Sequence, residues 1–209
     1  MWRLLQLADS AFPTGGFAHS GGLEAAAQAG EATDAAAFTR AAVWQAGFGA
    51  LPLAHDAWVD PGALARLDAR ANTFLANHVA NRASRTQGGA FFSTAARVFP
   101  GEAPGIPEGL CMHLAPLWGV VFRALGMSLE EMQRLLLWST ARGVLSAGVR
   151  LGLAGTYEAQ RMLAALGPTL DEVTAACATL GVESLAQPAP LIDLLQATHD
   201  RLHSRLFQT

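Results

Sequence analysis

Residues 128–150, SLEEMQRLLLWSTARGVLSAGVR, decide the fold class of this chain. The opening Ser128-Leu129-Glu130-Glu131 has the spacing of a capping box, in which a serine and a glutamate satisfy amides at a helix start. Behind it one stripe recurs at helical spacing: Leu135, Trp138, Arg142, Leu145 and Val149. Small residues lie beside that stripe, namely Gly143, Ser146, Ala147 and Gly148. The stretch predicts a long helix that another backbone can approach closely.

Further helix signals lie on both sides of this stretch. Asp60-Pro61 predicts a helix start, and apolar residues after it share one face: Leu64, Leu67, Ala71, Phe74 and Leu75. Charged and polar residues, including Asp68, fall on other faces. Thr169-Leu170-Asp171-Glu172 has the spacing of a second capping box, and a last helix is expected over about 190–203.

Signals for β-structure are weak. No segment alternates between apolar and polar residues, β-branched residues are scarce, and glycine and proline over 99–107 mark a loop. We therefore expect an all-α fold, a single compact domain over residues 1–209 with about eight to ten helices.

The composition excludes several classes of function. The chain has 209 residues, of which 51% are hydrophobic and only 15% charged, so apolar surface for protein contacts is expected. A net charge of −3 without a basic run argues against nucleic acid as a partner. All 14 basic residues are arginine, which excludes a P-loop lysine, a Schiff base and a lysine general base.

The expected setting is soluble and cytoplasmic. The two cysteines form no CxxC motif, which favours a reduced compartment. Gln6 and Asp9 interrupt the apolar start too early for a signal peptide, and the longest uncharged apolar run, Leu114 to Phe122, is too short to span a bilayer.

The N-terminal stretch from Leu4 to Glu24 contains an unusual loop, expected over residues 8–24. Four glycines, a proline, a histidine and two phenylalanines make it apolar and conformationally permissive, unlike a plain polar connector. Its main chain is expected to hold one specific shape. Phe12 and Phe17 would either pin it to the core or present it to a partner.

Candidate catalytic and metal-binding residues form only fragments of sites. Ala18-His19-Ser20-Gly21-Gly22 has the outline of a nucleophile elbow, which leaves a serine hydrolase using Ser20 and His19 as an alternative, although that motif needs a strand before it. His19 would otherwise tie down the loop. Cys111-Met112-His113 and the pair His199 and His203 each offer two metal ligands, fewer than a complete site needs. We expect no catalytic set and no metal site.

Four arginines that lie in the polar run or on the long helix have two interpretations. Arg82 and Arg85 lie in a polar run over residues 81–89, and Arg142 and Arg150 lie on the long helix. They could pair with buried carboxylates, or one could enter a GTPase site as a trans-acting finger.

Five motifs in order resemble the urease accessory protein UreF family. They are Leu4–Glu24 with Phe-Pro-Thr-Gly-Gly-Phe-Ala-His-Ser-Gly-Gly-Leu-Glu, Arg82–Gly88, His113–Gly119, Ser146–Gly152 with Gly155 and Gln160, and His199–Phe207. Together they span nearly the whole chain. The family's last motif usually has tyrosine where this chain has His203.

The resemblance implies a non-enzymatic maturation factor. UreF-like proteins are all-α homodimers that bind UreD (called UreH in some organisms) and recruit the GTPase UreG to apo-urease for nickel insertion. The complex handles the nickel, and no tightly bound cofactor is implied. Whether the protein binds nickel itself, and whether it activates or restrains the GTPase, stay open. A helical regulator of another process is a further alternative.

Residue by residue, the resemblance implies a set of partner-binding positions. In the N-terminal loop they are Phe12, Pro13, Phe17, His19, Ser20 and Glu24, which would face a partner or order the loop. In the central motif they are Arg82, Ser84 and Gln87. Arg150 and Gly152 are expected near the GTPase, and a partner-binding tail of about residues 200–209 contains Ser204, Arg205, Leu206 and Phe207.

Overall fold

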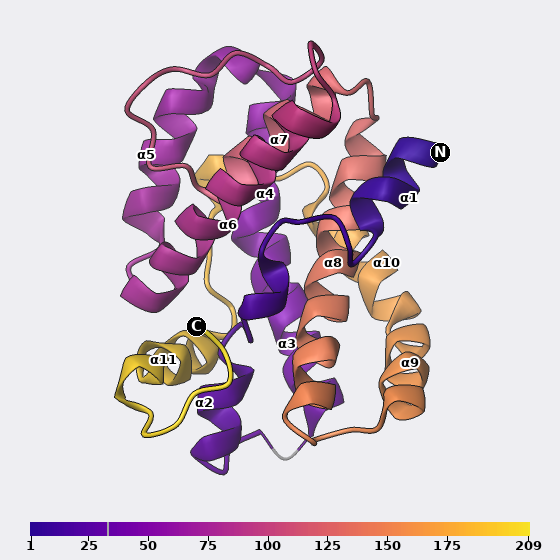
Figure 1. Cartoon of the computed structure of the whole chain (residues 1–209), viewed down its shortest axis with the longest axis vertical. Coiled ribbons are helices and arrows are strands. Elements are labelled where there is room, and N and C mark those ends of the chain that lie inside the picture. The colour runs from indigo at the N-terminus through magenta and orange to yellow at the C-terminus, as the bar shows by residue number, and fades with distance from the viewer. Residues whose placement is uncertain (33) are drawn as a thin grey trace.

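Every regular element in residues 1–32 and 34–209, the part of the chain that the computed structural model describes, is a helix. The α-helices are α1 (Trp2–Ala8), α2 (Leu23–Gln28), α3 (Ala35–Phe48), α4 (Ala50–Val59), α5 (Leu64–Phe74), α6 (His78–Val98), α7 (Leu114–Ala124), α8 (Leu129–Arg150), α9 (Thr156–Ala165), α10 (Gly167–Cys177) and α11 (Pro190–Ala197). Single 3-10 turns are η1 (Gly16–Ala18), η2 (Pro61–Ala63), η3 (Val182–Ser184) and η4 (His199–Arg201). The predicted all-α fold is confirmed, and the helices pack into one domain (Figure 1).

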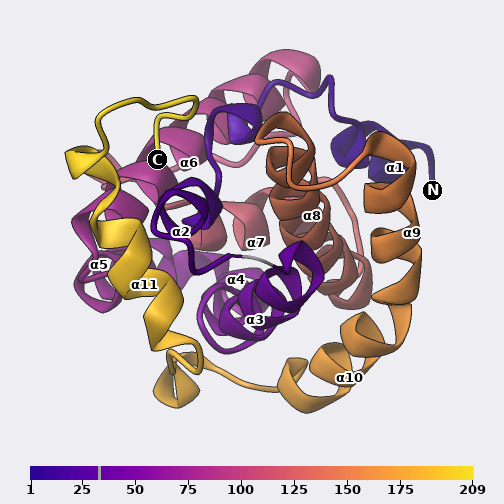
Figure 2. The same cartoon turned by 90° about the horizontal axis from the view of Figure 1, so that it is seen from below.

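Helix α7 lies at the centre of the domain and packs on α4, α5, α6 and α8 (Figure 2). Residues Pro116–Phe122 are buried without interruption, as expected for a helix that is apolar on all sides. Its rings continue an aromatic stack from α6, with Trp118 centred 5.0 Å from Phe91 and 4.8 Å from Phe122. Phe12 packs on Phe91 at 6.5 Å and so pins the N-terminal loop to this core.

The tightest helix contact joins α7 to α4 at a glycine. A Cβ built on Gly119 would lie 2.2 Å from the carbonyl oxygen of Ala54 and 2.8 Å from the amide nitrogen of Trp58. Both atoms are backbone of α4 and cannot move aside as a side chain would. The packing of α7 on α4 therefore requires the absence of a side chain at this position.

Helix α8 begins as its sequence predicts. The Ser128 hydroxyl accepts from the Glu131 amide at 3.1 Å, and the Glu131 carboxylate accepts from the Ser128 amide at 2.9 Å, which forms the predicted capping box. A Cβ on Gly148 would lie 3.6 Å from the side chain of Leu23 of α2, an ordinary packing distance, so side chains and not a second backbone lie against this glycine. At Gly143 an added Cβ would have no atom of the described residues within 4 Å.

Two predicted helix boundaries are wrong. Thr169 does not cap a helix, because α10 already begins at Gly167 with Pro168 in its first turn, where proline's fixed φ favours helix. The last helix ends at Ala197 instead of about 203, and a 3-10 turn follows it. There His199 and Asp200 form bonds to distant residues, described below, which compete with continued helix.

The helices of the described residues also bear on membrane insertion. None of these helices is both long enough and apolar enough to cross a bilayer.

Replacing Gly119 by alanine is expected to destabilise the protein by about 1–3 kcal/mol, because the new methyl group overpacks a backbone contact. The matched control is Gly143→Ala in α8, where open space and better helix propensity should stabilise by up to about 1 kcal/mol. Urea unfolding followed by circular dichroism measures both. Equal midpoints for the two variants would contradict the packing described here.

Candidate functional site

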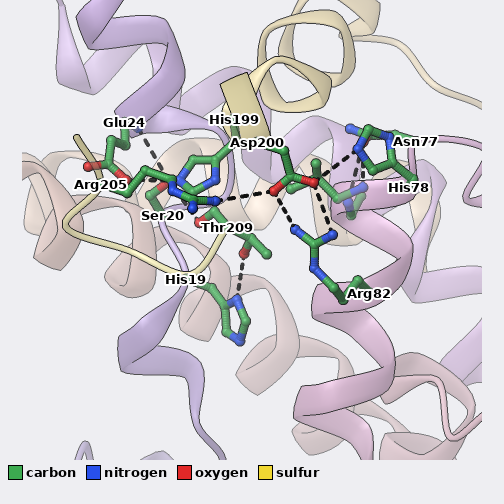
Figure 3. Close-up of polar contacts among 12 residues, drawn as sticks. His19, Ser20, Glu24, Asn77, His78, Arg82, His199, Asp200, Arg205 and Thr209 are labelled. Atoms are coloured by element: carbon green, nitrogen blue, oxygen red, sulfur yellow. Dashed lines mark hydrogen bonds and ion pairs between the residues drawn. The ribbon is translucent and has the colours of Figure 1, made fainter. Parts of the chain in front are cut away.

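The C-terminal tail, residues 202–209, lies against the N-terminal loop and α2 (Figure 3). Two main-chain bonds join them: the Gln208 amide donates to the Ala18 carbonyl at 2.8 Å, and the Ser20 amide donates to the Thr209 carbonyl oxygen at 2.7 Å. The Ser20 hydroxyl also donates to that oxygen, at 3.1 Å. Loop and tail, predicted as separate partner-binding segments, are therefore one structural unit.

Glu24 holds the tail from inside. Glu24 lies in the first turn of α2 and is 1% exposed. One carboxylate oxygen accepts from the Leu206 amide at 2.6 Å, and the other accepts from the Phe207 amide at 3.1 Å and from Nε2 of His199 at 2.9 Å. A buried carboxylate needs such donors, so Glu24 is an internal anchor and not a contact surface.

Arg150 links the end of α8 to both segments. Its guanidinium lies 3.7 Å from the ring centre of Phe17 and 4.1 Å from that of Phe207, and it donates to the Phe17 carbonyl oxygen. Phe17 is 71% exposed, whereas Phe207 is 5% exposed. The arginine is thus held between two rings, and the outer ring stays available to solvent.

Asp200 binds two arginines and a histidine at the surface. Arg82 of α6 donates to both of its carboxylate oxygens, at 2.7 and 3.0 Å, and His78 and Arg205 lie at 3.2 and 3.5 Å. Hydrogen bonding from Arg82 lowers the pKa of Asp200 and the same bond raises the pKa of Arg82. The bidentate geometry fixes η4 on α6.

Ser84 faces a different partner, the segment before α7. Asn72 Oδ1 lies 3.2 Å from Nε2 of His113 and accepts from it, so Nδ1 accepts the Ser84 hydroxyl proton at 3.1 Å. The Ser84 oxygen in turn accepts from the Leu114 amide at 3.2 Å. His113 is fully buried, and desolvation lowers its pKa, with a further decrease from Arg85 and an opposing increase from Asp68.

The remaining predicted residues lie at the edges of this unit. The Pro13 carbonyl accepts from Thr94 of α6 at 2.9 Å. Gln87 points towards Gly16, where an added Cβ would lie 3.7 Å from its Oε1. Gly152 turns the chain after α8 with a φ of 73°.

Sequence reasoning missed most of the acceptors and caps that complete the unit. His199 was considered as a metal ligand paired with His203, and Asp200 only as part of the C-terminal motif and tail. The tail's other support, the bond from Gln28 Nε2 to the Ser204 carbonyl at 2.9 Å, carried no local signal. Asn77 caps α6 and also donates to the Asp193 carbonyl at 3.0 Å. Apart from the cap itself, these contacts join positions more than a hundred residues apart, which no local pattern reports.

The two-residue hydrolase arrangement does not form. Ser20 is 1% exposed and its hydroxyl donates to Thr209, while Nδ1 of His19 contacts the Thr209 hydroxyl. No strand precedes the motif in the described residues, as a nucleophile elbow requires. The geometry instead fits the other interpretation, in which His19 ties down the loop.

The candidate metal ligands also separate. His199 is buried against Glu24 while His203 is exposed beyond the end of η4, so the predicted helical pair is wrong. Both ring nitrogens of His113 already have partners. Within the described chain, no group of three or more His, Cys, Asp and Glu is placed to hold an ion.

Arg142 of the long helix, like Arg150, stacks on an aromatic ring and forms no ion pair among the described residues. Arg142 lies 5.2 Å from the Trp138 ring, and its Nε has no partner among the described residues. The predicted pairing of Arg142 and Arg150 with buried carboxylates is therefore wrong, as far as the described residues show. Each guanidinium lies over an aromatic ring instead.

Comparison with known proteins places this arrangement in a family. A family model described as UreF matches residues 23–167. The chain is 36% identical to "Urease accessory protein F" of Arabidopsis thaliana, over 99% of this chain and 91% of that protein. The chain belongs to the UreF family. It is also 36% identical to "Urease accessory protein UreF" of Cereibacter sphaeroides and 30% identical to that of Rhizobium etli, over 99% of this chain in both cases and 97% and 95% of theirs.

Glu24→Gln is expected to loosen the tail of this UreF-family protein, because an amide offers one acceptor and turns its NH₂ towards amide donors. Hydrogen exchange at Leu206 and Phe207 should accelerate by at least about tenfold, which corresponds to 1.4 kcal/mol. The control is Glu31→Gln, which removes the same charge from an exposed residue. Unchanged exchange at both amides in Glu24→Gln would show that the carboxylate does not hold the tail.

Stability is expected to fall as the pH drops below about 6.5, the ordinary histidine value. Burial lowers the pKa of His19, with Arg82 and His199 adding to the effect, and burial also lowers the pKa of His113. The unfolded chain therefore takes up protons that the folded chain refuses, and protonation favours unfolding. Urea midpoints at pH 7.5 and 5.5, with an NMR titration of His113, measure this. A His113 ring that titrates above 6.5 would contradict it.

Proposed function

We propose that this protein is a non-enzymatic urease maturation factor. It would act as a homodimer in the cytoplasm, bind UreD (UreH), and recruit the GTPase UreG to apo-urease so that nickel enters the active site. The nickel would be handled by the complex, without a tightly bound cofactor on this chain. The observation that carries the proposal is the match, over 99% of this chain, to proteins named as urease accessory proteins.

The geometry of the site supports a binding role. The unit of loop, tail and α8 end exposes aromatic and apolar side chains, among them Phe17 at 71% and Leu206 at 53%. Its buried polar groups, Ser20 and Glu24, hold backbone and have no access to a substrate. Exposed apolar groups on a rigid support suit protein recognition better than chemistry.

Burial separates the residues that hold the unit together from those that are free to contact a partner. Residues that point inward, Phe12, Glu24 and Phe207, fix its shape, and residues that point outward are the candidates for contact. Gly152 turns the chain directly after Arg150, so the α8–α9 turn lies at the same end of the molecule as the stacked Phe17. UreD at the tail and UreG at this turn would therefore bind neighbouring surfaces.

The proposal is tested by Leu206→Arg, which places a charge on the exposed part of the tail without opening the core. Co-purification with UreD is expected to be lost, and urease activation in cells that carry the urease operon without its UreF gene is expected to fall at least about tenfold. Val59→Arg is the control, since Val59 is 51% exposed at the end of α4. If wild-type protein restores no urease activity in these cells, the proposed function is wrong.

A further inference from the structure

An open groove runs between α6 and the segment that precedes α7. It is lined by Arg82, Arg85, Thr86, Gly89, Cys111 and Met112, among others. All of its lining residues belong to the described chain, and none of them is a carboxylate. The groove thus has a positive wall on α6 and a backbone wall on residues 110–112.

The backbone wall is held unusually firmly. Asp68 is 2% exposed, and its two carboxylate oxygens accept from the Cys111 amide at 2.5 Å and the His113 amide at 2.7 Å. Between them Met112 has a φ of 69°, the left-handed conformation that L residues rarely adopt. A buried charge and a strained residue are both unfavourable by themselves, and strain of this kind concentrates at functional sites.

Helix α6 approaches this wall at a glycine. A Cβ on Gly88 would lie 2.0 Å from the Met112 carbonyl oxygen and 2.7 Å from the Leu114 amide nitrogen. One residue later, Gly89 has nothing within 4 Å of an added Cβ. The first glycine locks the segment against α6, and the second leaves room at the groove for another main chain.

Arg85 is the arginine of this groove whose guanidinium has no carboxylate partner among the described residues. Its Nε donates to the Cys111 carbonyl at 3.2 Å, which anchors an otherwise exposed side chain. Its two terminal nitrogens form no hydrogen bond or ion pair within the described residues. Arg82 differs from Arg85 in this respect, because it shares the carboxylate of Asp200 with Arg205.

We propose that this groove binds an extended acidic segment of a partner protein, with a carboxylate of that segment paired to the terminal nitrogens of Arg85. A guanidinium anchored through Nε presents its two terminal nitrogens in the geometry that a carboxylate accepts. Thr86 offers a hydroxyl beside it, and Gly89 lets the partner's backbone approach. Duplex nucleic acid is a poorer fit, because it needs several unengaged cations and this groove has one.

The test uses a capped five-residue peptide of Asp and Glu as the probe, added to the ¹⁵N-labelled full chain at low salt. Amide shifts are expected to cluster at residues 85–90 and 110–112. Arg85→Glu should raise the dissociation constant at least about tenfold, since a charge-assisted bond exceeds 1.4 kcal/mol. Added salt should weaken binding in the same measurement.

The matched control is Arg66→Glu, the same charge reversal on an exposed residue of α5, which should leave the affinity unchanged. A second control is the Asn and Gln version of the peptide, which should not bind. Equal loss in the two variants, or shifts outside the groove, would overturn the proposal. Displacement of the peptide by stoichiometric inorganic phosphate or by duplex DNA would also overturn it, in favour of a phosphate site. Peptide binding needs no urease, so this proposal and the proposed function fail independently.

Discussion

The placement of both chain ends depends on the buried carboxylate of Glu24. Ordering the backbone of one residue costs about 1–2 kcal/mol, and residues 202–209 contain no helix that would order them locally. Glu24 supplies two acceptors for three donors from this segment and from His199, in a low-dielectric site where such bonds are strong. The carboxylate is itself positioned by α2, whose Leu23 packs against Gly148 of α8. The tail therefore takes its position from the long helix, although it does not touch most of it.

Helix α6 explains why a polar run lies in the middle of an apolar chain. This region contacts two different parts of the molecule. Asn77 and Arg82 bond to α11 and η4, whereas Ser84 and Gly88 contact the segment before α7. A hydrophobic helix could not serve both, because backbone amides and carbonyls need directed partners. The same run was interpreted from the sequence as a partner-facing motif. In the structure Asn81, Arg82 and Ser84 are engaged internally, whereas Arg85 and Thr86 keep donors without a partner among the described residues.

The sequence predicted what local chemistry determines and missed what distant contacts determine. Helix α8 was predicted with its capping box and apolar stripe, since both signals lie within its own residues. The end of the last helix was wrong because Asp200 bonds to Arg82, 118 residues away, and His199 bonds to Glu24. Asp68 is a further example of a distant contact that the sequence did not predict. Its spacing placed it on a polar face of α5, but in the structure its carboxylate is buried and accepts from the amides of Cys111 and His113. Residue patterns alone drew attention to the N-terminal loop, His19, Ser20, Arg82 and Arg150, whereas Glu24 and the tail entered only through the family resemblance. That these residues form one unit was not predicted.

The absence of lysine fits the way in which this fold uses positive charge. Arg150 stacks on two rings and donates to a carbonyl at once, and Arg123 lies over Trp58 at 5.0 Å while donating to the carbonyl of the same residue at 2.8 Å. A planar guanidinium can use its face and its edge together, whereas an ammonium group is more strongly hydrated and has no flat face to stack. With only 15% charged residues, the chain has few cations to distribute, and Arg3, Arg82, Arg123 and Arg150 each connect two or more elements or segments. Arginine makes that possible at the partly buried junctions between the loop, the tail and α8.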